Sequence, residues 1–163
     1  MGTHKLVLDD DFEEDFSLVA IHCSEEPYKV AYILNQFARL KLRREKSDLA
    51  FTSSGIEITL PLFGFEDHTE YTGYSLVTNK CKSAVIKTNN SGELFGNTTD
   101  KETMITYLIP ELKKVDYFLK IRSDFDNLGT KILVNQINEI KQIISAYQVE
   151  PEALKSRDNL IFD

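Results

Sequence analysis

The residues best suited to recognition chemistry form a basic group between positions 39 and 46. Its members are Arg39, Lys41, Arg43, Arg44 and Lys46. An arginine guanidinium presents paired donors that match a carboxylate or a phosphate, and lysine adds a mobile point charge. We therefore predict that this group docks an acidic partner. The alternative is structural, because cations are also favoured near a helix C-terminus and on an exposed strand edge.

Two further clusters contain residue types that enzymes and metal sites use. Residues 66–70 read Glu-Asp-His-Thr-Glu, but no second histidine follows at zinc-site spacing, and the chain has no CxxC or HExxH motif. His22 and Cys23 are neighbours on a predicted strand, where adjacent side chains point to opposite faces. We therefore predict no catalytic residue, no metal site and no cofactor, and we favour a non-catalytic role.

Charge is distributed unevenly along this chain of formal net charge −7. Residues 1–26 carry one base and eight acids, whereas residues 27–47 carry six bases and one acid. The acidic run at 9–15 lacks the ligand spacing of a calcium loop and is interpreted as a solvated segment. The overall negative charge makes nucleic-acid binding an unfavourable hypothesis, because phosphate recognition requires many clustered cations.

Hydrophobic periodicity predicts the elements that must position these residues. Apolar, β-branched or alternating runs predict strands, and a 3.6-residue apolar period between capping residues predicts helices. Turn-forming residues at 87–102 predict a long loop. The predicted strands are 16–23, 56–60, 71–77, 104–109, 115–121 and 143–149, and the predicted helices cover about 25–40 and 126–142. We expect 71–77 to pair with 56–60.

Two segments, 16–50 and 116–150, share a strand–helix–strand pattern at an offset of 100 residues. Right-handed crossovers place the helices of two such units on one face of a common sheet. We therefore predict an α+β fold, a two-layer sandwich with ferredoxin-like split βαβ units. The sheet is expected to be mainly antiparallel and extended by central hairpins, with the two main helices on one face.

The 163 residues suit one domain. We expect an acidic N-terminal segment (1–15), a single α+β domain (16–152) and a C-terminal tail (153–163). No apolar run approaches the roughly 18 residues of a membrane span, and the first residues do not resemble a secretory signal. We therefore expect a cytoplasmic protein whose two cysteines are thiols.

A short motif joins one predicted strand to the next. It reads Ile109-Pro110-Glu111, three further residues, then Val115-Asp116-Tyr117. With this motif the chain resembles the IPExxxVDY family, which is associated with Bacteroidota, and the resemblance runs from Phe16 to Phe162. It implies no activity. Proline ends a strand and a strand tyrosine buries its ring, so we interpret the motif as structural, with a functional Asp116–Tyr117 pair as the alternative.

These observations predict a non-catalytic protein-binding or regulatory module that docks an acidic protein partner through the basic group. The process is not indicated, and a homodimer remains open. The first alternative is an ACT-like regulatory domain that binds a small metabolite between its helices and loops, an idea that rests on fold analogy. The second is an RNA- or ribosome-associated factor, which the same basic group favours and the net charge opposes.

Overall fold

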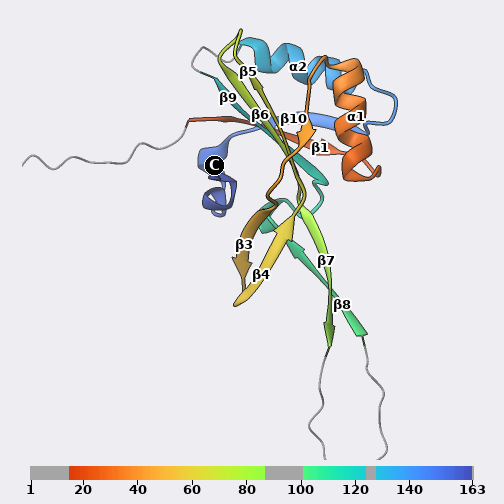
Figure 1. Cartoon of the computed structure of the whole chain (residues 1–163), viewed down its shortest axis with the longest axis vertical. Helices are drawn as coiled ribbons and strands as arrows, with labels where there is room; N and C mark the ends of the chain where they lie inside the picture. Colours follow the sequence, from red (N-terminus) through yellow and green to blue (C-terminus); the bar gives the residue numbers. More distant parts are fainter. Residues whose placement is uncertain (1–14, 87–100, 124–127, 163) are drawn as a thin grey trace, which may run out of the picture.

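A computed structural model of the chain describes residues 15–86, 101–123 and 128–162, with the backbone alone described at 84–86, 101 and 128. Its main sheet has six strands in the order β10-β1-β9-β6-β5-β2, and all neighbours are antiparallel (Figure 1). In that order the strands are β10 (Ser145–Val149), β1 (Ser17–His22), β9 (Tyr117–Ser123), β6 (Thr72–Thr78), β5 (Leu62–Asp67) and β2 (Arg43–Arg44).

Both helices pack on one face of this sheet (Figure 1). They are α1 (Pro27–Phe37) and α2 (Leu128–Asn138). Since β1 is antiparallel to both β9 and β10, these two strands run parallel to each other, and α2 connects them. This is a split βαβ unit. The predicted fold class, an α+β two-layer sandwich with a mainly antiparallel sheet, is therefore confirmed.

The first core lies between the helices and the sheet. Val30, Ile33 and Leu34 of α1 and Ile137 of α2 are buried there against the inward face of the strands. Proline at the first helical position favours the start of α1. The helix ends at Phe37 rather than near 40, because Arg39 adopts a left-handed φ of 57° that breaks the helical repeat.

A second core covers much of the opposite face. Phe118 and Val77 of the sheet pack there with Leu160, which is fully buried. Leu160 belongs to a C-terminal strap, residues 151–162, which contains the short 3-10 helices η2 (Pro151–Ala153) and η3 (Arg157–Leu160). The strap leaves part of this sheet face, over β5 and β6, open to solvent.

Two separate hairpins extend away from the main sheet (Figure 1). They pair β3 (Leu49–Ser53) with β4 (Ile56–Leu60), and β7 (Lys80–Ile86) with β8 (Lys101–Tyr107). The expected pairing of 56–60 with 71–77 is wrong, because β6 pairs with β5 and β9 instead. Most of the predicted 87–102 loop lies outside the described residues, and its last two residues belong to β8.

Two helix asparagines close the backbone beside the outer strands. Asn35 accepts the N–H of Leu42 (2.8 Å) and donates to its carbonyl (2.9 Å). Asn138 makes the same pair of bonds to Ala146, at 2.8 and 2.7 Å. The sequence offset of 100 aligns Asn35 with Asn135, so the structural equivalence is shifted by one helical turn. These backbone groups are not free to pair with another chain.

Candidate functional site

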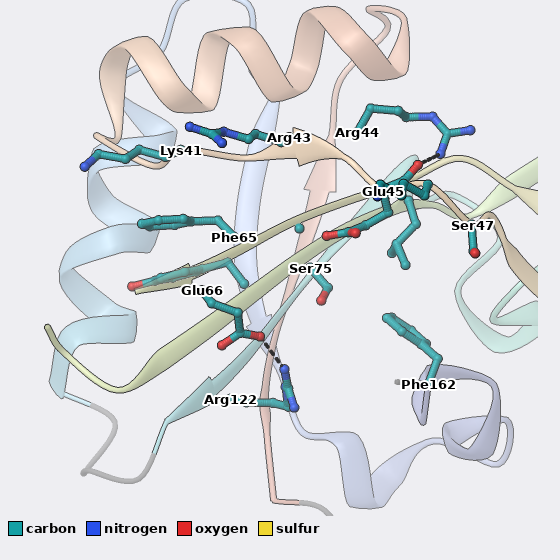
Figure 2. A pocket seen from close by; sticks show the side chains of 14 residues that line it. Lys41, Arg43, Arg44, Glu45, Ser47, Phe65, Glu66, Ser75, Arg122 and Phe162 are labelled. Atoms are coloured by element: carbon teal, nitrogen blue, oxygen red, sulfur yellow. Dashed lines mark hydrogen bonds and ion pairs between the residues drawn. The ribbon is translucent and has the colours of Figure 1, made fainter. Parts of the chain in front are cut away.

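The candidate site is a basic groove with a volume of about 720 Å³ beside the edge strand β2 (Figure 2). It lies mainly over the open part of the sheet face opposite the helices. Gly64 and Ser75, which are paired across β5 and β6, form its floor. Its charged lining residues are Lys41, Arg43, Arg44, Lys46, Arg122, Glu45 and Glu66, and Phe162 of the strap forms one wall.

The basic side chains around β2 point alternately to the two faces of the sheet. Leu42 is buried in the first core and anchored by its asparagine, so Lys41 and Arg43 point away from that core. Arg44 donates to the carbonyl of Glu45 at 2.9 Å, pairs with Asp48 and lies 5.9 Å from the ring centre of Phe63. Figure 2 shows Lys41 and Arg43 extending to the opposite side from Arg44.

The groove has an excess of positive charge, with five cations and two carboxylates among its lining residues. Arg122 pairs with Glu66 at 2.6 Å, and Arg44 pairs with Asp48. By contrast, Lys41, Arg43 and Lys46 form no ion pair with any residue that the structure describes. These three cations, all exposed, are therefore available to an anionic ligand.

Arg39 does not belong to the groove. Its left-handed backbone directs the chain away after α1, and it lines a different cavity with Phe37, Gln136 and Glu139. The fold thus brings four of the five predicted basic residues together and separates the fifth. The same cavity lies between the two helices rather than on the open sheet face.

Small residues make room for charged side chains on the floor. A Cβ on Gly64 would overlap the carboxylate of Glu45, which lies over this glycine. A Cβ on Gly73 would lie 2.9 Å from Glu66 Oε1 and 3.0 Å from Arg122 Nη2. The two glycines therefore allow these side chains to lie flat on the sheet, where Figure 2 shows Glu66 and Arg122 facing the groove.

A buried lysine fixes the aromatic wall. Lys120 of β9 is 1% exposed, and its Nζ lies 4.7 Å from the ring centre of Phe162 and 4.8 Å from that of Phe16. A cation over two ring faces is attracted by both π systems. This contact ties the C-terminal strap and the residue that precedes β1 to the same point beside the groove.

Sequence reasoning missed Glu45, Glu66, Ser75, Arg122 and Phe162 as groove residues. Their separation in sequence reaches more than 100 residues, and only strand pairing brings them together. Glu45 is the one acid in the basic stretch 27–47, but its position relative to the basic residues indicates no role for it. Gly64 and Gly73 were the available signal in the sequence, since a glycine in a strand can make room for a neighbouring side chain. Which side chain takes that room depends on which strands are paired.

The IPExxxVDY residues are organised by Asn79, which is fully buried between β6 and β7. Asn79 Oδ1 accepts the N–H of Ile109 at 2.8 Å. Its Nδ2 donates to the carbonyls of Leu112 (2.9 Å) and Val115 (3.0 Å). Pro110 begins the short 3-10 helix η1 (Pro110–Leu112), so this one side chain holds the turn between β8 and β9.

Asp116 and Tyr117, at the start of β9, hold the segment between β1 and α1. Asp116 accepts the backbone N–H of Cys23 at 3.0 Å and pairs with Lys80 at 3.0 Å. The hydroxyl of Tyr117 donates to the carbonyl of Glu25, and burial raises the pKa of this tyrosine. The phenol therefore stays protonated and serves as a donor, which agrees with a structural interpretation.

The described residues of the other candidate clusters make separate contacts. His22 contacts the hydroxyl of Tyr147 at 3.1 Å, while burial raises the pKa of the Cys23 thiol. Asp67 accepts the N–H groups of Thr69 (2.9 Å) and Glu70 (3.2 Å) and so closes the turn after β5. Within 15–86, 101–123 and 128–162, no three potential metal ligands gather. Residues 9–14 of the acidic run lie outside these ranges.

Glu111 attaches the C-terminal strap to the motif, accepting the N–H of Ser156 at 2.6 Å. Partial burial acts to raise its pKa, but hydrogen bonds, including those from Ser156 and Lys155, outweigh this and lower it. The ionised carboxylate of Glu111 therefore stabilises the folded protein. This contribution is complete above the ordinary pKa of 4.5 and is lost as the pH falls through the lower pKa that Glu111 has in the folded protein.

We therefore expect Glu111→Gln to destabilise the strap at pH 7. We also expect the strap of this variant to lose less stability than that of the wild type when the pH falls below about 4, because glutamine cannot be protonated there. Amide hydrogen exchange at Leu160 checks this, with Glu152→Gln on the exposed strap surface as the matched control. Exchange at Leu160 that is the same in the Glu111 variant and the wild type would show that Glu111 does not hold the strap.

Neither helix in the described ranges is long and apolar enough to cross a lipid bilayer. Comparisons with protein-family models, with curated proteins and with solved structures found no match for this chain, and none therefore bears on the IPExxxVDY resemblance.

Proposed function

We propose that the protein is a non-catalytic binding module whose basic groove docks an acidic segment of a partner protein. The observation that carries this proposal is the convergence of Lys41, Arg43 and Lys46 on one groove without an ion pair to a described residue. Cations concentrated on a concave surface raise the local concentration of an anionic ligand and steer its approach.

The mixture of groups favours a polypeptide over a nucleic acid. Glu45, Glu66 and Ser75 line the groove together with the cations. A polypeptide offers backbone N–H donors for these acceptors and acidic side chains for the cations. A sugar-phosphate backbone carries a charge at every nucleotide and offers no backbone N–H donor to these acceptors, and the chain carries a net charge of −7. This weighs against the RNA- or ribosome-associated alternative.

The free energy that the ion pairs contribute indicates how tightly the partner binds. An exposed ion pair contributes about 0.2–1 kcal/mol, so three cations contribute on the order of 2 kcal/mol. The remainder must come from the apolar wall at Phe162 and from backbone contacts. We therefore expect a reversible, salt-sensitive complex rather than a permanent one, since exposed charges are screened at high ionic strength.

The test is capture of the tagged protein from its own cells at moderate salt, with mass spectrometry of the proteins that co-purify. The wild type is compared with a groove variant in which Lys41, Arg43 and Lys46 are all replaced by glutamate. The proposal expects a stoichiometric partner with an acidic segment, which the groove variant loses. Retention of the same partner by the variant would remove the groove from the proposal.

A second candidate function is supported by a cavity of about 600 Å³ between the helices and the sheet. Phe65 and Tyr74, stacked at 5.9 Å, form its apolar wall. Burial, together with the carboxylates of Glu70 and Asp67, raises the pKa of Tyr74. Small-molecule pockets have this size and combine an apolar wall with a few polar groups, which supports a metabolite-binding regulatory domain.

A thermal-shift screen of nucleotides, amino acids and glycolytic intermediates tests this second candidate. A ligand present at about 100 times its Kd stabilises the folded state by about 2.7 kcal/mol, so Tm should rise by several degrees. Leu133→Glu, which places a charge at the buried edge of the cavity, should abolish the shift. Identical Tm values with every compound would rule against a metabolite site for these ligand classes.

The IPExxxVDY assignment and a cytoplasmic location are part of the same proposal. The motif in the sequence supports the first. Two free cysteines, as expected for a reducing compartment, support the second.

A further inference from the structure

We infer that the acidic segment, residues 9–15, is an occupant of the basic groove of its own chain and competes there with the partner. The segment contains six acidic residues and no base. Three cations of the groove lack an ion pair within the described part of the chain. The competition rests on the proposed function, whereas the contact within the chain does not.

The point at which this segment joins the fold lies beside the groove. Lys120 Nζ lies 4.8 Å from the ring centre of Phe16 and 4.7 Å from that of Phe162, which lines the groove. Ser17 pairs with Ile121, the neighbour of the groove residue Arg122. From Phe16 back to Asp9 the chain spans at most roughly 25 Å. The acidic residues are therefore within reach of the cations.

Connection within one chain makes even a weak attraction effective. A tethered segment has an effective concentration of about 1 mM. If its intrinsic Kd for the groove is about 0.1 mM, an external acidic ligand binds roughly tenfold more weakly than it would to an empty groove. The attraction acts between exposed charges, so about 0.5 M salt screens most of it.

The first experiment compares amide NMR spectra of full-length proteins at low and high salt. In the neutralised variant Asp9, Asp10, Asp11, Glu13, Glu14 and Asp15 are replaced by asparagine or glutamine. The control replaces six exposed acids elsewhere, Glu57, Glu70, Glu139, Glu150, Glu152 and Asp158, in the same way. We expect the neutralised variant to differ from wild type at Arg43, Lys46 and Gly64 at low salt only. Unchanged shifts at these residues would overturn the inference.

The second experiment separates this inference from the proposed function. A fluorescein-labelled hexaglutamate peptide serves as the probe, and the neutralised variant should bind it about tenfold more tightly than wild type. Equal binding by both proteins, with no NMR difference, would refute the contact and leave the proposed function intact. An NMR difference without probe binding to either protein would support the contact and refute the acidic-partner function.

Discussion

Replacing Asn79 by alanine is expected to lower the free energy of unfolding by about 3–5 kcal/mol. The side chain of Asn79 is fully buried and makes three hydrogen bonds to backbone groups of the motif turn. Alanine would leave the N–H of Ile109 and the carbonyl of Val115 without these partners in the interior, whereas the carbonyl of Leu112 still accepts the N–H of Val115 at 3.0 Å. Each unsatisfied buried group costs about 1–3 kcal/mol, and relaxation of the turn recovers part of the total.

Urea unfolding of the purified variants measures this effect. Asn135→Ala is the matched control, because Asn135 is exposed on α2 and its change should stay within about 0.5 kcal/mol. Asn79→Asp keeps an acceptor for Ile109 but places a carboxylate against two carbonyl oxygens, so it should destabilise at least as much as alanine. A loss below 1 kcal/mol for Asn79→Ala would contradict the role of this side chain as the organiser of the motif.

Reversing the charge of the groove is expected to weaken binding of the acidic partner about 100-fold, or about 2.7 kcal/mol. The triple variant Lys41→Glu, Arg43→Glu and Lys46→Glu removes three attractions and introduces three repulsions. At about 0.2–1 kcal/mol for each exposed pair, the combined change lies in this range. The three residues are exposed, so the stability of the fold should change by less than about 1 kcal/mol.

Two controls separate the groove from charge in general. Reversal of the exposed lysines Lys114, Lys131 and Lys141 makes the same change in net charge away from the groove and should leave the affinity almost unchanged. Arg39→Glu should likewise have little effect, because Arg39 lines a different cavity. Weakening by the lysine control that equals that of the groove variant would mean that the partner responds to net charge alone.

Salt provides an independent measurement of the same effect. The affinity of the wild type should fall as ionic strength rises, because the cations are exposed. The affinity of the groove variant should be weak and nearly independent of salt. A wild-type affinity that does not respond to salt would show that apolar contacts, such as those at Phe162, dominate the complex.

Much of the fold could be predicted from local patterns. The strand at 56–60 coincides with β4. Most of the apolar positions predicted for the two helices lie in the first core, but Phe37 and Ile144, which were predicted with them, are exposed. The strand β5 is absent from the predicted strands, because glycine inside a strand is typical of an interruption. In the fold, the missing side chain of Gly64 makes room for Glu45. Pairing partners were harder to predict, because the register between distant strands depends on tertiary packing.

The candidate site was predictable only as far as it is local in sequence. Lys41, Arg43, Arg44 and Lys46 lie close together along the chain and remain together in the fold. Arg39 was expected among them because it is near in sequence, but its left-handed backbone directs it to another cavity. The opposing wall, from Arg122 to Phe162, is brought there by strand order and by the C-terminal strap, which no spacing rule could indicate.

The most direct measurement for the acidic-partner account is NMR mapping of the partner on the full-length protein. The acidic segment of a captured partner is titrated into labelled protein, and amide shifts are followed residue by residue. If the partner docks in the groove, the largest shifts fall at Arg43, Lys46, Gly64 and Ser75, and they are lost in the triple groove variant. Shifts concentrated instead on the exposed face of α1, at Tyr28 and Tyr32, would contradict the account and place the binding surface on the helical layer.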